Sequence, residues 1–311
     1  MAGHEGSKKA VIAALLANLA IAISKFVVYL ITGAASLLAE AIHSFADTGN
    51  QGLLLYGGKA AQKPPDDEHP FGYGNRRYFW AFIVALVLFS LGGLFAIYEG
   101  IEKLRHPHEL ESVGLAIALL IFALIVEGLS FRTAIHEANK ARGKQHLFRF
   151  IHRTKAPELP VVLLEDLGAM VGLLIALFGV TMAHFTDEPR WDAAGSLAIG
   201  ILLVIIAIFL AVEMSSLLLG EAATTEDVAK LRAAIDEHPT VGCIIHLRTE
   251  HIAPDEIVVA TKLEFDHSLS FEQLADEING VEARMRAAVP AARIIFIEPD
   301  VYRPEAAAAA D

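Results

Sequence analysis

The amino-acid sequence predicts an α-helical membrane protein with six transmembrane helices and a C-terminal cytoplasmic α/β domain. Three observations lead to this fold class. Of the 311 residues, 54% are apolar and the mean hydropathy is +0.48, which is unusual for a water-soluble protein. The apolar residues gather in six long segments before residue 220. The net negative charge gathers after them: of the formal charge of −12, the 17 acids and 8 bases from Ala222 onward account for −9.

Each apolar segment is near or above the roughly 20 residues that a helix needs to cross a bilayer. The predicted spans are Val11–Ile31, Ser36–Gly57, Tyr78–Ile101, Val113–Phe131, Leu159–Ala183 and Trp191–Leu219. We therefore divide the chain into an N-terminus (1–10), a six-helix membrane domain (11–220), an α/β domain (221–303) and an alanine-rich tail (304–311). The first ten residues are polar, and the apolar segment after them is too long for a signal peptide, so we expect no removed targeting segment.

Basic residues predict the orientation of the spans, because they are enriched in cytoplasmic loops. They lie before the first span (Lys8, Lys9), between spans two and three (Lys59, Lys63, Arg76, Arg77), and between spans four and five (six from Lys140 to Lys155). Lys103 and Arg105 oppose this orientation from the other side. We expect an integral protein of a bacterial inner (cell) membrane with both termini in the cytoplasm.

The segment after Gly220 has the pattern of a two-layer α-β-β-α-β domain of the ferredoxin-like kind. The predicted elements are a helix at Glu226–Glu237, strands at Cys243–Thr249 and Ile257–Phe265, a helix at Phe271–Val289 and a strand at Arg293–Ile297. Ser270 and Gln273 form a capping box before the second helix. The acidic surface of this domain disfavours nucleic acid as a partner.

The single cysteine, Cys243, excludes a disulfide framework and a cysteine-rich zinc site. A bound transition metal would need His, Asp and Glu ligands. No His-Glu-x-x-His or comparable motif is present, which argues against an intramembrane metalloenzyme. We expect no enzyme activity and no organic cofactor.

Ionisable residues inside the spans are the candidate functional residues, because a carboxylate at mid-bilayer costs about 3 kcal/mol even on insertion scales. In span two, His43 and Asp47 are four residues apart and share one helix face. In span five, Glu165 and Asp166 are adjacent and point roughly 100° apart. We take His43, Asp47 and Asp166 as metal ligands. Glu165 is a fourth ligand, a proton carrier or an acid paired elsewhere. The alternative reading of His43 and Asp47 is a hydrogen-bonded pair that joins helices.

The remaining intramembrane acids receive other interpretations. Glu127 in span four lies near Arg132, which favours a helix-packing or ion-pair role. Glu40 and Glu99 lie nearer the span ends and are interpreted as interfacial. His136, His146 and His152 flank the basic loop and are interpreted as solvated loop residues.

Together these pieces resemble the cation diffusion facilitator family over nearly the whole chain. The matching segments are the His43-x-x-x-Asp47 turn, the loop Pro65–Gly74, Asp166, and the α-β-β-α-β tail with Leu247–Thr249 and Ile294–Pro299. The Glu165–Asp166 pair and the segment Trp191–Ser196 are similar to the zinc-transporter-nine-like branch. The resemblance implies a homodimer, held by the C-terminal domain, that exports cytoplasmic Zn²⁺ in exchange for protons through a site between spans two and five.

The chain departs from the family pattern at three places. Many zinc-transporting members have a histidine where Val162 stands. A second metal site in the loop between spans two and three would retain Asp66 and His69, but its third position is Tyr73. The tail has Ile245, Lys262 and Phe296 where some members have metal-binding residues, which leaves Glu298 alone, and we expect no metal cluster there.

An oxygen-rich site with one imidazole suits Zn²⁺ but also improves the relative affinity of Mn²⁺, Fe²⁺ or Co²⁺. These ions remain alternatives as the transported substrate. A different class of function is a membrane-bound metal sensor or scaffold without transport. Flux of metal across a sealed bilayer separates the two classes.

Overall fold

The computed structural model describes residues 18–143 and 146–303. The predicted N-terminus (1–10), the first seven residues of the first span and the alanine-rich tail lie outside the described residues. The chain forms two compact units. Of the described residues, one unit contains those up to Ala60 and those from Arg76 to Ser215, and the other contains Ala61–Asn75 and those from Ser216 onward.

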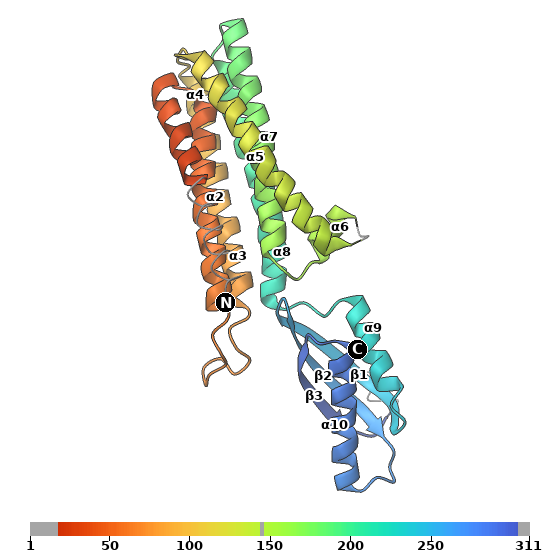
Figure 1. Ribbon diagram of the computed structural model, residues 1–311. Helices are drawn as coiled ribbons and strands as arrows, with labels where there is room; N and C mark the ends of the chain where they lie inside the picture. The colour runs from red at the N-terminus through yellow and green to blue at the C-terminus, as the bar shows by residue number, and fades with distance from the viewer. Residues whose placement is uncertain (1–17, 144–145, 304–311) are drawn as a thin grey trace, which may run out of the picture. The chain divides into compact units, whose positions relative to one another are not determined.

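The first unit consists of long helices that run side by side (Figure 1). A helix at Asn18–Thr32 is followed by α2 (Ala35–Ala60), α3 (Arg76–Val87), η1 (Leu88–Leu94), α4 (Phe95–Arg105), α5 (Val113–Arg142), α6 (Leu147–Arg153), α7 (Glu158–Thr186) and α8 (Arg190–Leu219). The π-helical turn η1 joins α3 and α4 into one continuous rod. Neither η1 nor the short helix α6 was predicted, and α5 continues eleven residues beyond the predicted end of span four, Phe131.

Four helices in the described part of the chain are long and apolar enough to cross a membrane: Arg76–Arg105, Val113–Lys140, Glu158–Thr186 and Arg190–Leu219. This confirms the prediction of a helical protein whose helices can cross a membrane. The six-span count stays a prediction. Helix α2 has 26 residues, but Glu40, His43, Asp47 and Asn50 interrupt its apolar surface.

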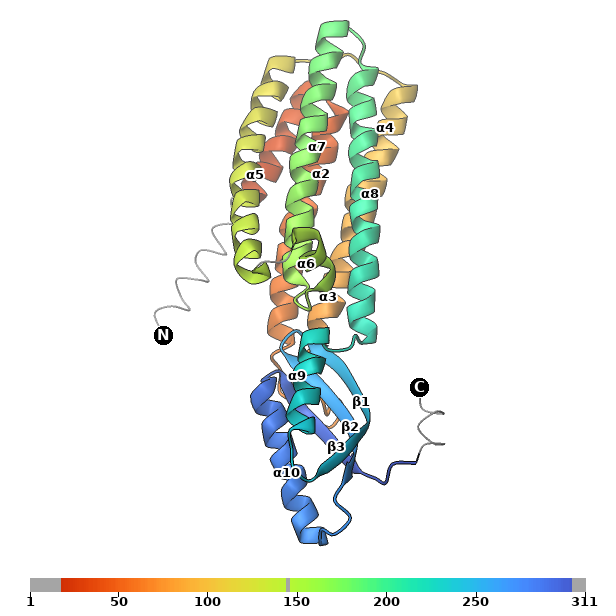
Figure 2. The same ribbon diagram turned by 90° about the vertical axis from the view of Figure 1, so that its right-hand side faces the viewer.

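Helix α2 packs between the α3–η1–α4 rod and α7, and α7 in turn packs on α5. Figure 2 shows α5, α7 and α8 next to one another, with α2 behind α7. The start of α2 is held from α8, because Asp192 accepts hydrogen bonds from the backbone N–H of Ala35 (2.5 Å) and of Ser36 (3.2 Å). A carboxylate at this position satisfies amides that a helix leaves unpaired at its N-terminus.

Glycines permit the close packing of the rod against α8. A Cβ atom at Gly100 would lie 2.7 Å from the backbone nitrogen of Leu197, and one at Gly93 would lie 2.6 Å from Cγ2 of Val204. Gly200 makes the reciprocal approach to Ile97. Small residues of this kind let membrane helices approach closely enough for dispersion contacts to stabilise the pair.

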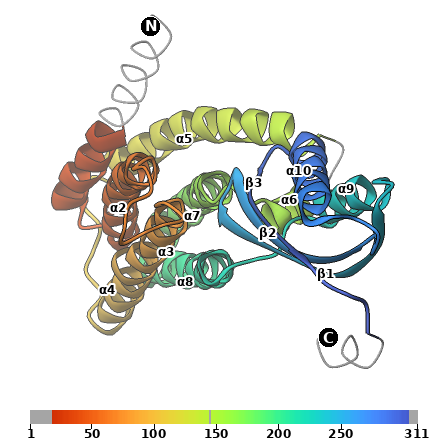
Figure 3. The same cartoon turned by 90° about the horizontal axis from the view of Figure 1, so that it is seen from below.

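The second unit contains a three-stranded sheet and two helices. The elements are α9 (Thr225–Asp236), β1 (Val241–Ala253), β2 (Glu256–Phe265), α10 (Phe271–Ala288) and β3 (Ala292–Pro299). The sheet order is β1-β2-β3, with β1 and β2 antiparallel and β2 and β3 parallel. Figure 3 shows both helices on one side of the sheet. The predicted order of elements is confirmed, with each boundary within four residues of its predicted position.

The alternation predicted for β2 positions the core of this unit. Its buried residues Ile257, Val259 and Leu263 pack with Leu231 and Ile235 of α9 and with α10. The predicted capping box is also present, because the Ser270 hydroxyl accepts from the backbone of Gln273 and the Gln273 side chain accepts from the backbone of Ser270.

Replacing Gly100 with isoleucine is expected to separate α4 from α8 and to destabilise the helical unit by about 1–3 kcal/mol, the usual cost of overpacking. The measurement is thermal unfolding of the full chain in detergent. Gly114→Ile is the matched control, because a Cβ at Gly114 meets nothing within 4 Å. Equal melting temperatures for the two variants would contradict the packing described for α4 and α8.

Candidate metal centre

Four polar residues line one face of α2. Glu40, His43, Asp47 and Asn50 are spaced by three, four and three residues, so that their side chains follow the same helix face. Glu40, His43 and Asn50 are fully buried, and Asp47 is 17% exposed. His43 Nε2 lies 3.5 Å from Asp47 Oδ2. We call these four side chains the α2 polar face.

Much of the α2 polar face has no hydrogen-bond partner within the described structure. The unpaired buried atoms are Oε1 of Glu40, both ring nitrogens of His43, Oδ1 of Asp47 and Oδ1 of Asn50. A buried polar group without a partner costs about 1–3 kcal/mol. One helix face that combines an imidazole with carboxylate and amide oxygens in this state is suited to receiving a cation.

Helix α7 adds its two adjacent acids on different sides. Glu165 is buried and accepts a hydrogen bond from Nδ2 of Asn50 at 2.7 Å, so it joins the α2 polar face. Asp166 instead faces α5, where Ser130 donates to its Oδ2 at 3.3 Å. Asp166 also lines a cavity of about 520 Å³ between α5 and the first turns of α7, together with Val162 and Glu158.

The structure thus brings His43, Asp47 and Glu165 to one side of α7 and leaves Asp166 on another. Nevertheless, Asp47, Glu165 and Asp166 interact electrostatically, and Glu127 of α5 interacts with both Asp47 and Asp166. Within residues 18–143 and 146–303, no three His, Cys, Asp or Glu side chains converge closely enough to hold a metal ion. Several acids thus lie near one histidine. To bind an ion, these side chains would have to move closer to one another.

Two glycines lie beside the α2 polar face. A Cβ at Gly92 of η1 would lie 3.9 Å from Nδ1 of His43, so the imidazole faces the π-helical turn. A Cβ at Gly172 of α7 would collide with Oε1 of Glu40. Single π-helical turns often occur at functional sites, and here the turn lies beside the histidine.

Lys25 is the functional candidate that sequence reasoning missed. It lies in the first helix, is fully buried, and places its Nζ atom 3.2 Å from Oε2 of Glu40. The interpretation of Glu40 as interfacial is therefore wrong, because Glu40 is fully buried in an ion pair. Glu127 has the ion-pair role expected for it, with Lys25 as a partner at 3.9 Å. Lys25 lies within the predicted first span, and an ionisable residue inside a span is by default a functional candidate. Lys25 could therefore have been identified in the same way as the intramembrane acids.

The loop that would hold a second metal ion is occupied by its own side chains. Asp66 Oδ2 accepts hydrogen bonds from Nζ of Lys63 (2.6 Å) and from the Tyr73 hydroxyl (2.7 Å). These two bonds hold the pKa of Asp66 well below its usual range. His69 stacks on the Tyr73 ring at 4.2 Å, with its Nδ1 3.8 Å from Oδ1 of Asp66. A metal ion at Asp66 would have to displace the Lys63 ammonium.

In the C-terminal unit, Lys262 stands at one of the positions where the resemblance to the family led us to look for a metal ligand. Its Nζ lies 2.9 Å from Oε1 of Glu298 and 3.1 Å from Oδ2 of Asp300. Hydrogen bonds to these two acids raise the pKa of Lys262. Glu298 therefore has a lysine partner.

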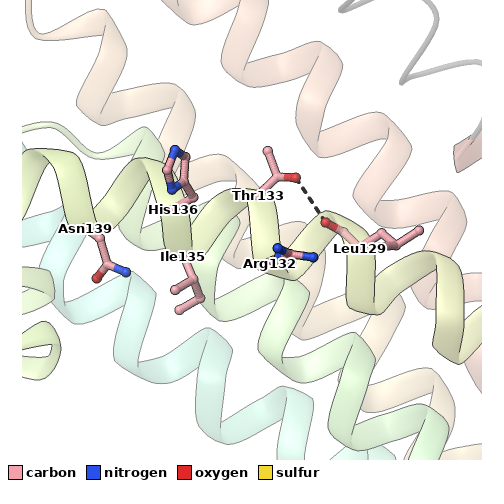
Figure 4. Close-up of a pocket in the computed structure, with 6 residues that line it drawn as sticks. All are labelled: Leu129, Arg132, Thr133, Ile135, His136 and Asn139. Carbon is pink, nitrogen blue, oxygen red and sulfur yellow. Dashed lines mark hydrogen bonds between the residues drawn. The ribbon is translucent and has the colours of Figure 1, made fainter.

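The three histidines interpreted as solvated loop residues are all exposed, but the interpretation is wrong about the loop, because His136 lies within α5 and His152 within α6. His136 lines a groove along α5 with Leu129, Arg132, Thr133, Ile135 and Asn139 (Figure 4). Among the described residues that line it, this groove has Arg132 and no carboxylate, which disfavours a cation. The exposed ring of His152 lies 2.5 Å from Oε1 of Glu213 on α8.

Comparisons with known proteins identify the family. The cation efflux transmembrane domain matches residues 11–219. The chain is 31% identical over 289 residues to the human proton-coupled zinc antiporter SLC30A9, mitochondrial, covering 89% of this chain and 51% of that protein. It is 30% identical over 262 residues to Metal tolerance protein C4 of Arabidopsis thaliana, covering 84% and 57%. It is 26% identical over 290 residues to the magnetosome protein MamB of Paramagnetospirillum magneticum, covering 92% of each.

Long apolar helices with buried acids define an integral membrane protein of the cation-efflux class. The chain belongs to the cation diffusion facilitator family, in the zinc-transporter-nine-like branch. It spans about half the length of the human and plant relatives that it matches.

The Asp66 contact predicts a pH dependence for its loop. A carboxyl whose pKa is lowered on folding stabilises the fold above its ordinary pKa, here 3.8, and loses that contribution as the pH falls through the folded value. Hydrogen exchange of residues 63–74 should therefore be slower than in Lys63→Met at about pH 6, and the difference should shrink below about pH 4. A difference that already disappears between about pH 7 and 5 would contradict the assignment.

Proposed function

We propose that this protein is a proton-coupled antiporter that exports Zn²⁺ from the cytoplasm through a site between α2 and α7. The observation that carries the proposal is the α2 polar face, where His43 and the largely buried Asp47 carry buried ligand atoms without a hydrogen-bond partner, inside a membrane-capable helical unit. The human relative, named as a proton-coupled zinc antiporter, supports the choice of ion and of coupling.

The proposed ligands are His43, Asp47 and the α7 acids Glu165 and Asp166. Zinc takes four nitrogen or oxygen ligands at about 2.0–2.2 Å. A neutral His43 with two carboxylates would balance the charge of the ion, which matters where residual charge is costly. Glu165 faces α2 in this structure, whereas Asp166 lies in the cavity beside α5. We assign Asp166 to the first contact with the incoming ion.

The position of the cavity supports this order of contacts. The cavity is lined by Glu137 near the end of α5, by Ala156 just before α7 and by Glu158 at the start of α7. The distribution of basic residues predicts that these helix ends face the cytoplasm. An ion that enters there meets Asp166 and then, through a small turn of α7, the side chains of Glu165, Asp47 and His43.

Proton coupling follows from the chemistry of the ligands. Carboxylates and imidazole must be deprotonated to bind a metal ion, so binding releases protons. After the ion leaves on the opposite side, protons from that side would neutralise the acids. Rocking or turning of packed helices would alternate access to the site.

We further propose six transmembrane spans, both termini in the cytoplasm and a homodimer held by the C-terminal unit. The membrane is proposed to be a bacterial inner (cell) membrane, whereas the animal relatives are named as mitochondrial. Mn²⁺, Fe²⁺ or Co²⁺ are the alternative substrates, because carboxylates dominate the proposed ligand set. A metal sensor or scaffold is the competing class, and the absence of metal flux would favour it.

Replacing His43 or Asp47 with alanine is expected to lower the rate of Zn²⁺ uptake into proteoliposomes at least tenfold, because each variant removes a ligand and leaves the remaining groups unable to complete the shell. His106→Ala and Asp276→Ala are the matched controls, because both side chains are exposed and neither belongs to the α2 polar face.

The controls should transport Zn²⁺ at the rate of the unmodified protein. Transport by Asp47→Ala at that same rate would refute the site. Binding of Zn²⁺ without flux in the unmodified protein would support the sensor or scaffold.

A further inference from the structure

Lys25 occupies a cage of oxygen atoms supplied by two other helices. Its Nζ atom lies 2.8 Å from the Ser44 hydroxyl and 3.2 Å from Oε2 of Glu40, both on α2, and 3.9 Å from Oε1 of Glu127 on α5. The lysine and Glu40 side chains are fully buried, and the Glu127 side chain is 15% exposed. The cage thus joins the first helix, α2 and α5 through one ammonium group.

The oxygen cage is chemically a cation site. Two carboxylates and a hydroxyl are the donors that hard divalent ions such as Mn²⁺ and Mg²⁺ prefer. Oε1 of Glu40 remains buried without a hydrogen-bond partner, and Gly172 of α7 leaves the space into which that oxygen projects. The Lys25 ammonium, a compact point charge with several donors, takes the place of a mobile ion.

The cage lies next to the proposed transport site. Glu40 precedes His43 by about one helical turn on the same face of α2. A divalent ion in the cage would therefore lie next to an ion at His43 and Asp47, in a medium that screens charge poorly. Two such ions would repel each other strongly, and the pair would hinder release of either one.

We propose that Lys25 is a tethered cation that fills the cage of Glu40, Glu127 and Ser44 and thereby excludes a second divalent ion from beside the transport site. The inference rests on the proposed function only for the identity of the neighbouring site. A purely structural ion pair would join the same three helices but would not determine how many ions the protein binds. The number of bound ions therefore separates the two roles.

The test is Mn²⁺ binding to the purified full chain in detergent, with free Mn²⁺ followed by electron paramagnetic resonance. Lys25→Ala should bind about one Mn²⁺ per chain more than the unmodified protein, because the oxygen donors remain while the ammonium is removed. Lys25→Arg, which retains the positive charge, should bind the unmodified number. Adding Glu40→Gln to Lys25→Ala should abolish the gain.

Two outcomes would overturn the proposal: a folded Lys25→Ala protein that binds the unmodified number of Mn²⁺ ions, or a gain that persists in the double variant with Glu40→Gln. If Lys25→Ala does not fold in metal-free buffer, millimolar Mn²⁺ should restore a monodisperse protein in size-exclusion chromatography. Failure of Mn²⁺ to do so would also overturn the proposal.

The Asp47→Ala background distinguishes this inference from the proposed function. Lys25→Ala combined with Asp47→Ala should retain the gain relative to Asp47→Ala alone, because the cage does not include Asp47. Loss of the gain in that background would refute a separate cage. Unchanged Zn²⁺ flux in Asp47→Ala would instead refute the transport site and leave the Mn²⁺ count intact.

Discussion

The structure depends on one constraint, which is that polar side chains within a membrane-capable bundle must find partners among the neighbouring helices. Helix α2 carries four such side chains on one face. Lys25 neutralises Glu40 at one end of this face, and Asn50 donates to Glu165 at the other. Between them, His43 and Asp47 have each other at 3.5 Å and otherwise unpaired ligand atoms. The middle of the face is therefore where a cation would gain most from binding.

The surrounding helices are arranged to hold α2 firmly while leaving this middle region adaptable. Asp192 of α8 caps the first turn of α2, and the Lys103 ammonium donates to the carbonyl of Gly33 just before it. Glycines fit the η1–α4 rod tightly against α8. By contrast, η1 and α7 each place a glycine beside the α2 polar face, Gly92 next to His43 and Gly172 next to Glu40. A rigid attachment at the end of α2 and small residues beside its polar face would allow the ligands to adjust around an ion without loss of the helical packing.

Much of the fold could be predicted because it follows from periodicities within single segments. The alternation of β2 and the capping box at Ser270 were both predicted from local sequence, and so was the shared helix face of His43 and Asp47. Contacts between helices could not be predicted in the same way. No periodicity indicates that Lys25 of the first helix contacts Glu40 of α2. Nor does any periodicity indicate that Glu165 faces α2 while Asp166 faces α5. The position of Glu40 near a span end suggested an interface, but the ion pair with Lys25 permits its complete burial.

The most direct test of the central claim is to locate zinc in the protein by anomalous scattering at the zinc absorption edge, using the full chain loaded with Zn²⁺. The account predicts a zinc peak between α2 and α7, about 2.0–2.2 Å from a ring nitrogen of His43 and from a carboxylate oxygen of Asp47, with an acid of α7 completing the site. Zinc bound only elsewhere, with the α2 polar face still unliganded at saturating Zn²⁺, would contradict it.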